Sequence, residues 1–389
     1  MIPARVYSSQ TLALLDRVRD LKAAGHDVVS FAAGESDFPT SDIVVHEAFE
    51  SVKRGNTRYV SPSGQMNLRE AVAKDYRDRL GASWITAEHV LPTFGAKQGL
   101  YLVLASLLDP EDEVLVPKPY WVSYPGLVKA CRGRVIEVTT QEANAFFPTA
   151  EELEKVYSPQ TKALIFSSPS NPLGTMISES QLRDILAWCR RRRVTLIYDE
   201  IYERLVLDPA HRHVCPLALA SEAESEYVVA VNATSKSLAM TGWRLGFVLG
   251  TKANLDNLRA MQSQMVTCLP GFIQDGAAAG LAQVDAILAP IIQAYRDRLK
   301  VLVEALEKIP GIRFVRPTGA FYVAVDVSGV VMRKGYRSDV EFAERLLAQE
   351  HLAVLAGTSM GMPGWIRLSF ATSLDDVKRG VERLARFVS

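Results

Sequence analysis

The chain has 389 residues, of which 48% are hydrophobic and 23% charged, and its 44 Lys and Arg balance 44 Asp and Glu. The length exceeds what one hydrophobic core usually organises, and the composition excludes a disordered or fibrous protein. Because the formal net charge is zero, no overall field attracts nucleic acid or an anionic membrane, and a small molecule is the expected partner.

Targeting, membrane and metal signals are missing from the sequence. Its four cysteines are far apart and show no paired spacing of the kind that builds zinc sites or disulfide frameworks. The first twenty residues do not read as a signal peptide, and no stretch approaches the roughly 20 apolar residues that span a bilayer. We therefore expect no metal, no membrane association and a cytoplasmic location.

Short apolar runs alternate with helical stretches from about residue 41 to residue 280. This pattern predicts a large α/β domain over residues 43–285, with a mostly parallel central sheet and helices on both faces. Helices are expected at 99–108 and 179–191. The runs rich in β-branched residues, which predict buried parallel strands, are Glu113–Pro117, Ala163–Ser167, Val194–Tyr198 and Tyr227–Val231.

The rest of the chain predicts a smaller α+β domain, made of residues 1–42 and 286–389. A long helix over 286–308 leads to a strand at 319–325, a helix at 338–350, a strand at 366–370 and a last helix. No linker rich in Pro, Gly or Ser separates the two parts, so we expect them to share a long helix and a tight interface.

Lys236 follows the expected strand Tyr227–Val231, and Arg244 lies eight residues further on. The carboxyl ends of strands in an open α/β sheet border the ligand crevice, where a reactive amine would meet a cofactor. A lysine taken alone is usually a solvated surface residue, so the prediction depends on its neighbours.

Asp199 ends another strand, and Tyr202 follows one helical turn later. A carboxylate at this edge could keep a pyridine nitrogen protonated, which lets the ring accept electrons from a carbanion. The alternative for Asp199 is an ordinary helix N-cap.

Asn171 lies in the proline-bounded turn 168–174 after a third strand, where its amide could donate to a phenolic oxygen or satisfy its own turn. Gly95, Ala96 and Lys97 open a helix, whose backbone N–H groups favour an anion such as a phosphate, although the motif alone is weak.

Trp121 could stack on a heteroaromatic ring or belong to the core. Arg367 alternates with apolar residues on a strand and could hold an α-carboxylate by two parallel hydrogen bonds, or it could be solvated.

Taken in order, these stretches resemble fold-type I enzymes that use pyridoxal 5'-phosphate (PLP), specifically the class I/II aminotransferases, and are similar to bacterial aspartate and aromatic aminotransferases. The likeness covers nearly the whole chain. It rests on Ala-Ala-Gly-Glu at 32–35, Tyr59, Gly-Ala-Lys-Gln at 95–98, Pro-Tyr-Trp at 119–121, Ser-Asn-Pro-Leu-Gly at 170–174, Asp-Glu-Ile-Tyr at 199–202, Ser-Lys at 235–236 with Arg244, and Ile-Arg-Leu-Ser at 366–369.

The resemblance implies a transferase of amino acid metabolism that forms a Schiff base (aldimine) between Lys236 and PLP. The enzyme would move an α-amino group from an L-amino acid to a 2-oxo acid with ping-pong kinetics. Other PLP reactions on the same fold, namely β- or γ-elimination, cyclisation or amino-acid oxidation, stay open as alternatives.

The resemblance also implies a role for each site residue. Asp199 would pair with the ring nitrogen, Asn171 and Tyr202 would contact the ring hydroxyl, and Trp121 would stack on the ring. Arg367 would hold the substrate carboxylate beside Gly34. The phosphate would be bound by the Gly95, Ala96 and Lys97 loop, Ser235, Arg244 and, from the partner subunit of a homodimer, Tyr59.

The sequence departs from the family pattern at Ala233, where a phosphate-binding serine is common, and at Ser36 and Met360, which we expect near the specificity pocket. Ser9, Thr11 and Lys97 match positions that some relatives use to bind an acidic side chain. Lys97 could therefore bind a distal carboxylate or could simply belong to the cofactor loop.

Overall fold

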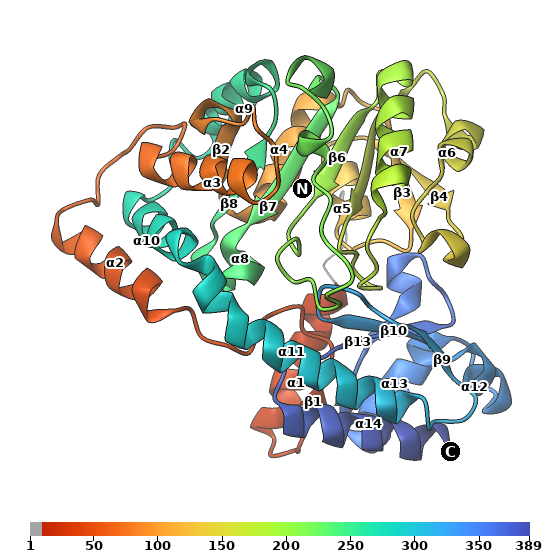
Figure 1. The fold of residues 1–389 in the computed structure, drawn as a ribbon. Coiled ribbons are helices and arrows are strands. Elements are labelled where there is room, and N and C mark those ends of the chain that lie inside the picture. Colours follow the sequence, from red (N-terminus) through yellow and green to blue (C-terminus); the bar gives the residue numbers. More distant parts are fainter. Residues whose placement is uncertain (1–9) are drawn as a thin grey trace, which may run out of the picture.

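The computed structural model describes residues 10–389, and side chains from residue 13 onward. Figure 1 shows two parts, a larger one around a seven-stranded sheet and a smaller one around a four-stranded sheet, with α11 running between them. α11 (Val284–Leu306) begins beside the large part and ends in the small one. The domain boundaries at residues 43 and 286 stay a prediction, and α11 starts two residues before the second of them.

The large sheet has a parallel core and one reversed strand. Only β8 runs antiparallel to its neighbours, and the other strands are parallel to one another. This confirms the predicted α/β fold class. In spatial order the strands are β2 (Val90–Thr93), β8 (Gly246–Leu249), β7 (Val228–Ala233), β6 (Thr195–Asp199), β5 (Thr161–Ser167), β3 (Glu113–Lys118) and β4 (Arg134–Thr139).

Successive side chains of the buried strands point to opposite faces of the sheet and pack into two separate cores, one on each face. Leu164 and Leu196 belong to one core, whereas their chain neighbours Ile165 and Ile197 belong to the other. The first core also receives α3 (Met66–Asp78), α6 (Ala150–Val156), α7 (Glu179–Arg192) and α10 (Gly271–Ala282), and the second receives α4 (Gly95–Leu107), α5 (Tyr124–Ala130) and α9 (Lys252–Met265).

The small part is an antiparallel sheet covered by helices. Its strand order is β12 (Leu355–Ala356), β13 (Trp365–Ser369), β10 (Tyr322–Asp326) and β9 (Arg313–Val315). A short parallel pair joins β1 (Val29–Ser30) to β11 (Leu352–Ala353). The remaining helices are α1 (Gln10–Ala23) and α2 (Asp42–Lys53) near the N-terminus, and α12 (Ser328–Arg333), α13 (Asp339–Glu350) and α14 (Leu374–Val388) near the C-terminus.

Side-chain caps explain where several helices begin. Ser178 accepts a hydrogen bond from the Gln181 N–H at the start of α7, and Ser373 accepts one from the Asp376 N–H at the start of α14. The helical turn expected between Asp199 and Tyr202 is wrong. The chain forms successive tight turns there, in which the Glu200 carbonyl accepts from the Glu203 N–H and the Tyr202 carbonyl accepts from the Leu205 N–H.

Across residues 10–389, no single helix is both long and apolar enough to cross a membrane. α10 and α11 pass the length and hydropathy criterion only as a pair, and they are bent by 73° at their junction.

Candidate active site

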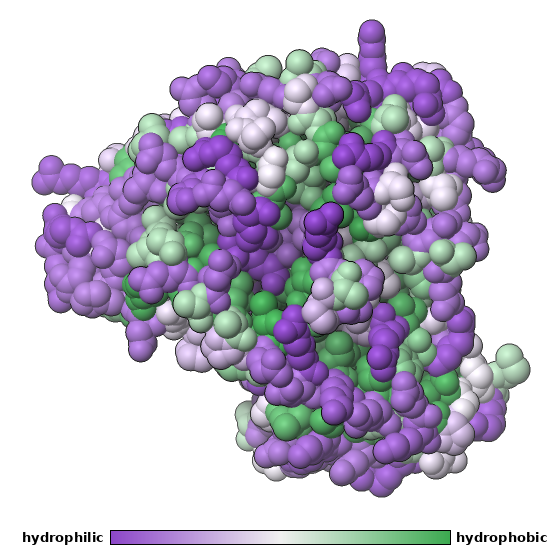
Figure 2. All heavy atoms as spheres, viewed as in Figure 1, coloured by the Kyte–Doolittle hydropathy of each residue, from purple (hydrophilic) through white to green (hydrophobic). Residues whose placement is uncertain are grey.

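A pocket of about 300 Å³ lies at the carboxyl ends of β5, β6 and β7, and β10 and β13 of the small part close its other side. In the view of Figure 2, hydrophobic side chains gather near the junction of the two parts, whereas most of the outer surface is hydrophilic. All predicted cofactor and substrate residues except Gly95 and Tyr59 line the pocket: Gly34, Ala96, Lys97, Trp121, Asn171, Asp199, Tyr202, Ser235, Lys236, Arg244 and Arg367.

Lys236 sits in α8 (Thr234–Ser237), the short helix directly after β7, so the strand end places its side chain in the pocket. Its Nζ donates a hydrogen bond to the Gly34 carbonyl. Burial lowers the pKa of Lys236 to about 8, with Glu35 raising it and Arg367 lowering it. A lysine with this pKa is about one-tenth neutral at pH 7, far more than an ordinary lysine, which suits an amine that acts as nucleophile and base.

Asp199 is buried at the end of β6 and is held by two donors. Tyr124 Oη donates to its Oδ2 at 2.8 Å, and the Ile201 N–H donates to its Oδ1 at 3.1 Å. Burial raises the pKa of Asp199 from 3.8 to about 6, and the Tyr124 hydrogen bond opposes this rise. The anionic carboxylate is therefore costly until a positive partner, such as a protonated ring nitrogen, enters the pocket.

The first turn of α4 offers unpaired backbone donors. Phe94 precedes the helix and gives no side-chain cap, so the N–H groups of the first turn remain available. Gly95 has φ +74°, and a Cβ there would lie 2.6 Å from Arg244 Nη2. The close approach of this guanidinium to a helix N-terminus, with buried Ser235 also lining the pocket, makes a cup suited to a phosphate.

Arg367 projects from β13 into the same pocket and is only 2% exposed. Its Nη1 donates to Asn171 Oδ1 at 2.9 Å and its Nη2 donates to the Ala32 carbonyl at 2.7 Å. The buried Nε has no hydrogen-bond partner. Since Asn171 uses its oxygen for Arg367, its amino group is the part left to donate to a ligand.

The aromatic side chains of the pocket make specific contacts. Trp121 packs edge-on against Tyr124, with ring centroids 5.4 Å apart, and Lys97 Nζ lies 4.9 Å from the Trp121 centroid. Buried Tyr202 shares a 2.7 Å hydrogen bond with Tyr322. Tyr124 and Tyr322 were not predicted from the sequence. The only signal for Tyr124 was its spacing of three residues from Trp121.

Several expectations are corrected or left outside the site. Tyr59 is 87% exposed on the loop after α2 and does not line the pocket of its own chain. Ser36 and Met360 were expected near the specificity pocket, but neither lines it. Ser36 instead hydrogen-bonds Tyr295 on α11 at 2.8 Å, and Met360 is buried beside Tyr120, whose N–H its carbonyl accepts.

Two other expected residues cannot be placed. Ser9 and the side chain of Thr11, expected to bind an acidic side chain, lie outside the described residues. Within residues 10–389, no group of three or more His, Cys, Asp and Glu is arranged to hold a metal ion.

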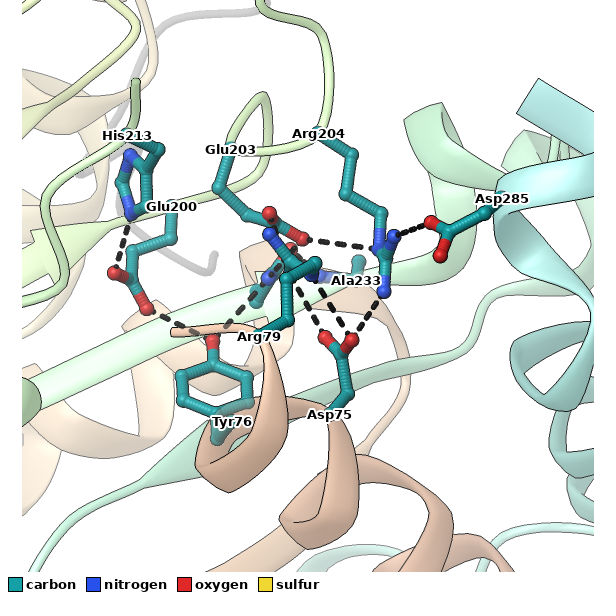
Figure 3. Close-up of polar contacts among 10 residues, drawn as sticks. Asp75, Tyr76, Arg79, Glu200, Glu203, Arg204, His213, Ala233 and Asp285 are labelled. Atoms are coloured by element: carbon teal, nitrogen blue, oxygen red, sulfur yellow. Dashed lines mark hydrogen bonds and ion pairs between the residues drawn. The ribbon is translucent and has the colours of Figure 1, made fainter. Parts of the chain in front are cut away.

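A buried polar network connects α3 with β7 and with the segment that follows β6 (Figure 3). Glu203 lies between two arginines, with Arg79 Nη2 2.7 Å from its Oε2 and Arg204 Nε 3.6 Å from its Oε1. Nearby, Tyr76 donates a 2.8 Å hydrogen bond to Glu200. The network ties the chain directly beyond β6 to the rest of the large part.

The pocket residues fit PLP. A phosphate matches the uncapped helix start beside Arg244, a pyridine nitrogen matches the buried carboxylate of Asp199, and an aldehyde matches the buried amine of Lys236. The guanidinium of Arg367, which lines the same pocket, adds a cation for the carboxylate of an amino acid.

Comparison with known proteins agrees with this chemistry. A family model described as aminotransferase class I and II matches residues 26–384. The chain is 36% identical to an aspartate aminotransferase of Geobacillus stearothermophilus, over 99% of this chain and 97% of that one. It is 38% identical to a probable aspartate/prephenate aminotransferase of Thermus aquaticus, over 97% and 96% of the two chains.

Solved structures show the same likeness. The aspartate aminotransferase of Thermus thermophilus with maleate superposes with a TM-score of 0.93 at 35% identity, covering 100% of both chains. That of Thermotoga maritima superposes with a TM-score of 0.90 at 33% identity, covering 99% of each. The cofactor, the enzyme class and transamination predicted from the sequence are thereby confirmed. The chain belongs to the class I and II aminotransferases, which use PLP to move amino groups between amino acids and 2-oxo acids.

Proposed function

We propose that this aminotransferase prefers a dicarboxylic amino acid, such as aspartate or glutamate, and that Lys97 binds its distal carboxylate. The observation that carries the proposal is that the pocket holds two cations, Arg367 and Lys97, besides Lys236 and Arg244, which are assigned to the cofactor. Lys97 makes no ion pair with any described residue, and its Nζ lies over the ring of Trp121. The names of the Geobacillus and Thermus relatives, aspartate aminotransferase, support the same substrate class.

The two cations suit different carboxylates. Arg367 is buried, fixed by Asn171 and Ala32, and planar, which favours a paired grip on the α-carboxylate. Lys97 lies over Trp121 as a point charge, and its pKa is lowered by loss of solvation and by Arg244. A substrate carboxylate beside Lys97 would stabilise the charged ammonium and so offset the cost of its burial.

The proposed roles of the other residues follow from their contacts. PLP, when bound, supplies an electron-accepting ring that stabilises negative charge on the substrate Cα. Asp199 would stabilise the protonated ring nitrogen, Asn171 and Tyr202 would donate to the phenolic oxygen, and Lys236 would accept and return the Cα proton. Trp121 covers one face of the ring.

The first experiment measures amino transfer to a 2-oxo acid from a panel of donors that includes aspartate, glutamate, alanine and tyrosine. Lys97→Met should lower kcat/KM for aspartate by about thirtyfold, as expected for loss of a charged hydrogen bond of about 2 kcal/mol. The value for alanine should stay within about twofold. Equal losses for both donors would contradict the role of Lys97, and Lys236→Ala should abolish transfer from every donor.

Product analysis separates transamination of the preferred donor from side reactions. Transamination yields one 2-oxo acid for each amino group transferred, whereas elimination releases ammonia and oxidation releases peroxide. A donor that gives ammonia in place of amino transfer would overturn the proposed substrate.

We also propose a homodimer in which Tyr59 completes the phosphate site of the partner subunit. Tyr59 is exposed, and so are Phe49, Val52 and Met66 on the neighbouring α2 and α3. Large apolar side chains that are exposed on a single chain are typical of residues that an interface covers. Mixed dimers of Tyr59→Ala and Lys236→Ala chains should regain about a quarter of wild-type activity, because half the dimers are mixed and each mixed dimer holds one complete site. No recovery on mixing two soluble inactive chains would refute the shared site.

A further inference from the structure

Tyr322 joins the cofactor side of the pocket to the carboxylate side. It is the first residue of β10, is 1% exposed and lines the pocket between Tyr202 and Arg367. We propose that Tyr322 is a positioning residue with two separable tasks: its hydroxyl orients the hydroxyl of Tyr202, and its ring supports the guanidinium of Arg367. This inference rests on the proposed roles of Tyr202 and Arg367.

The first task follows from counting hydrogens. The hydroxyls of Tyr202 and Tyr322 are 2.7 Å apart, and each carries a single hydrogen. If the hydroxyl of Tyr202 donated its hydrogen to Tyr322, it would have no hydrogen left to donate to the phenolic oxygen of the cofactor. Either hydroxyl can donate in this pair, and the proposal assigns the donor to Tyr322, which leaves the hydrogen of Tyr202 free to point into the pocket.

The second task follows from the strand register. Arg367 on β13 lies opposite Ala324 on β10, so Tyr322, two residues earlier, shares the same face of the sheet. Because Ala324 has a small side chain, the guanidinium can lie across the neighbouring ring. Arg367 Cζ is 4.3 Å from the centroid of Tyr322, well within the range of a cation–π contact.

The glycine at position 34 fits the same arrangement. A Cβ on Gly34 would lie 2.5 Å from Tyr322 Oη, so any larger residue would push the hydroxyl away from Tyr202. The carbonyl of Gly34 also accepts the hydrogen bond of Lys236. Gly34 thus keeps the space in which the Tyr322 hydroxyl reaches its partner.

Two substitutions separate the tasks. Tyr322→Phe removes only the hydroxyl, and should raise the Kd of the apoprotein for PLP about fivefold, the loss of one net hydrogen bond of about 1 kcal/mol. It should leave the Kd of the holoenzyme for maleate, an unreactive dicarboxylate, within twofold. Tyr322→Leu also removes the ring, and should raise the maleate Kd about thirtyfold, as expected for a buried cation–π contact of about 2 kcal/mol.

A double-mutant cycle tests whether Tyr322 acts through Tyr202. If it does, Tyr322→Phe has no further effect on PLP binding when Tyr202 is already Phe. An additive loss in that background, an unchanged PLP Kd in the single variant, or equal maleate binding by the Phe and Leu variants would overturn the proposal.

Separate control experiments test whether each variant folds and whether the wild-type protein binds its ligands. Circular dichroism and urea midpoints check that each variant folds, and Tyr322→Met replaces the Leu variant where that one does not. PLP binding by equilibrium dialysis requires no turnover. If the wild-type protein bound neither PLP nor maleate, the proposed function would fail before the role of Tyr322 came into question.

Discussion

Replacing Asp199 by Asn should stabilise the cofactor-free protein while removing its affinity for PLP. Burial raises the pKa of this carboxyl from 3.8 to about 6, a difference of about two pH units. At 1.36 kcal/mol for each unit, the charged form costs about 3 kcal/mol of folding free energy at pH 8. Asn has the same shape and no charge. Its oxygen can accept from the Ile201 N–H, and its amino group can donate to Tyr124.

The pH dependence of the stability difference shows whether the buried charge of Asp199 causes it. Because the folded protein holds this proton up to about pH 6 and the unfolded chain loses it near pH 3.8, the penalty is absent below about pH 4 and complete above about pH 7. Urea unfolding of the apoproteins at fixed protein concentration should show the Asn variant about 3 kcal/mol more stable at pH 8. The two proteins should become equally stable as the pH approaches 4.

Adding PLP should favour the wild-type protein over the Asn variant, the reverse of the order expected for the apoproteins. It should stabilise the wild-type protein according to its concentration and Kd, and should do so far less for the Asn variant, whose neutral amide cannot balance a protonated ring nitrogen. A stability difference that does not change between pH 4 and pH 8, or an Asn variant less stable at pH 8, would refute the reasoning.

Three further predictions concern the phosphate cup, the reactive amine and the buried ion pairs. Gly95→Ala should destabilise the protein by about 1–2 kcal/mol because of its positive φ, and should weaken PLP binding by displacing Arg244; Gly126→Ala, which meets no atom within 4 Å, should do neither. In the apoprotein, acetylation of Lys236 followed by mass spectrometry should have a midpoint near pH 8, well below that of exposed lysines, and a midpoint near 10 would contradict its burial. Arg79→Met should cost about 3 kcal/mol in urea unfolding because it leaves buried Glu203 short of positive charge, whereas Arg190→Met, from an exposed pair with Glu224, should cost at most about 0.5 kcal/mol.

The sequence predicted residues that stand at strand ends and helix starts. Lys236, Asp199 and Asn171 each follow a run of buried β-branched residues, and parallel strands bring their carboxyl ends to one edge. Arg367 was predicted from its alternation with apolar neighbours, although its unpartnered Nε depends on tertiary contacts. Local pattern marked these four residues as candidates and left an ordinary alternative open for each, and their roles came from the family resemblance.

Contacts between distant segments could not be predicted in this way. Tyr322 reads as an ordinary core residue of a strand, because the register that sets Ala324 opposite Arg367 is not visible in either segment. The same holds for the chain beyond Tyr202, where residues 205–208 form backbone hydrogen bonds with Thr318 and Ala320, more than a hundred residues away. Ser36 looked like a residue of the pocket, yet its hydroxyl turns to Tyr295 on α11.

The pocket lies between the two parts of the molecule, and its residues come from both. Lys236, Asp199 and Asn171 belong to the seven-stranded part, while Arg367 and Tyr322 belong to the four-stranded part. Arg367, the proposed ligand of the α-carboxylate, can therefore be replaced without changing the side chains of the larger part that are proposed to hold the cofactor. Because every α-amino acid carries the carboxylate proposed for Arg367, a laboratory search for new amino donors should randomise Lys97 on α4 first, and leave Arg367 and the ends of β5, β6 and β7 untouched.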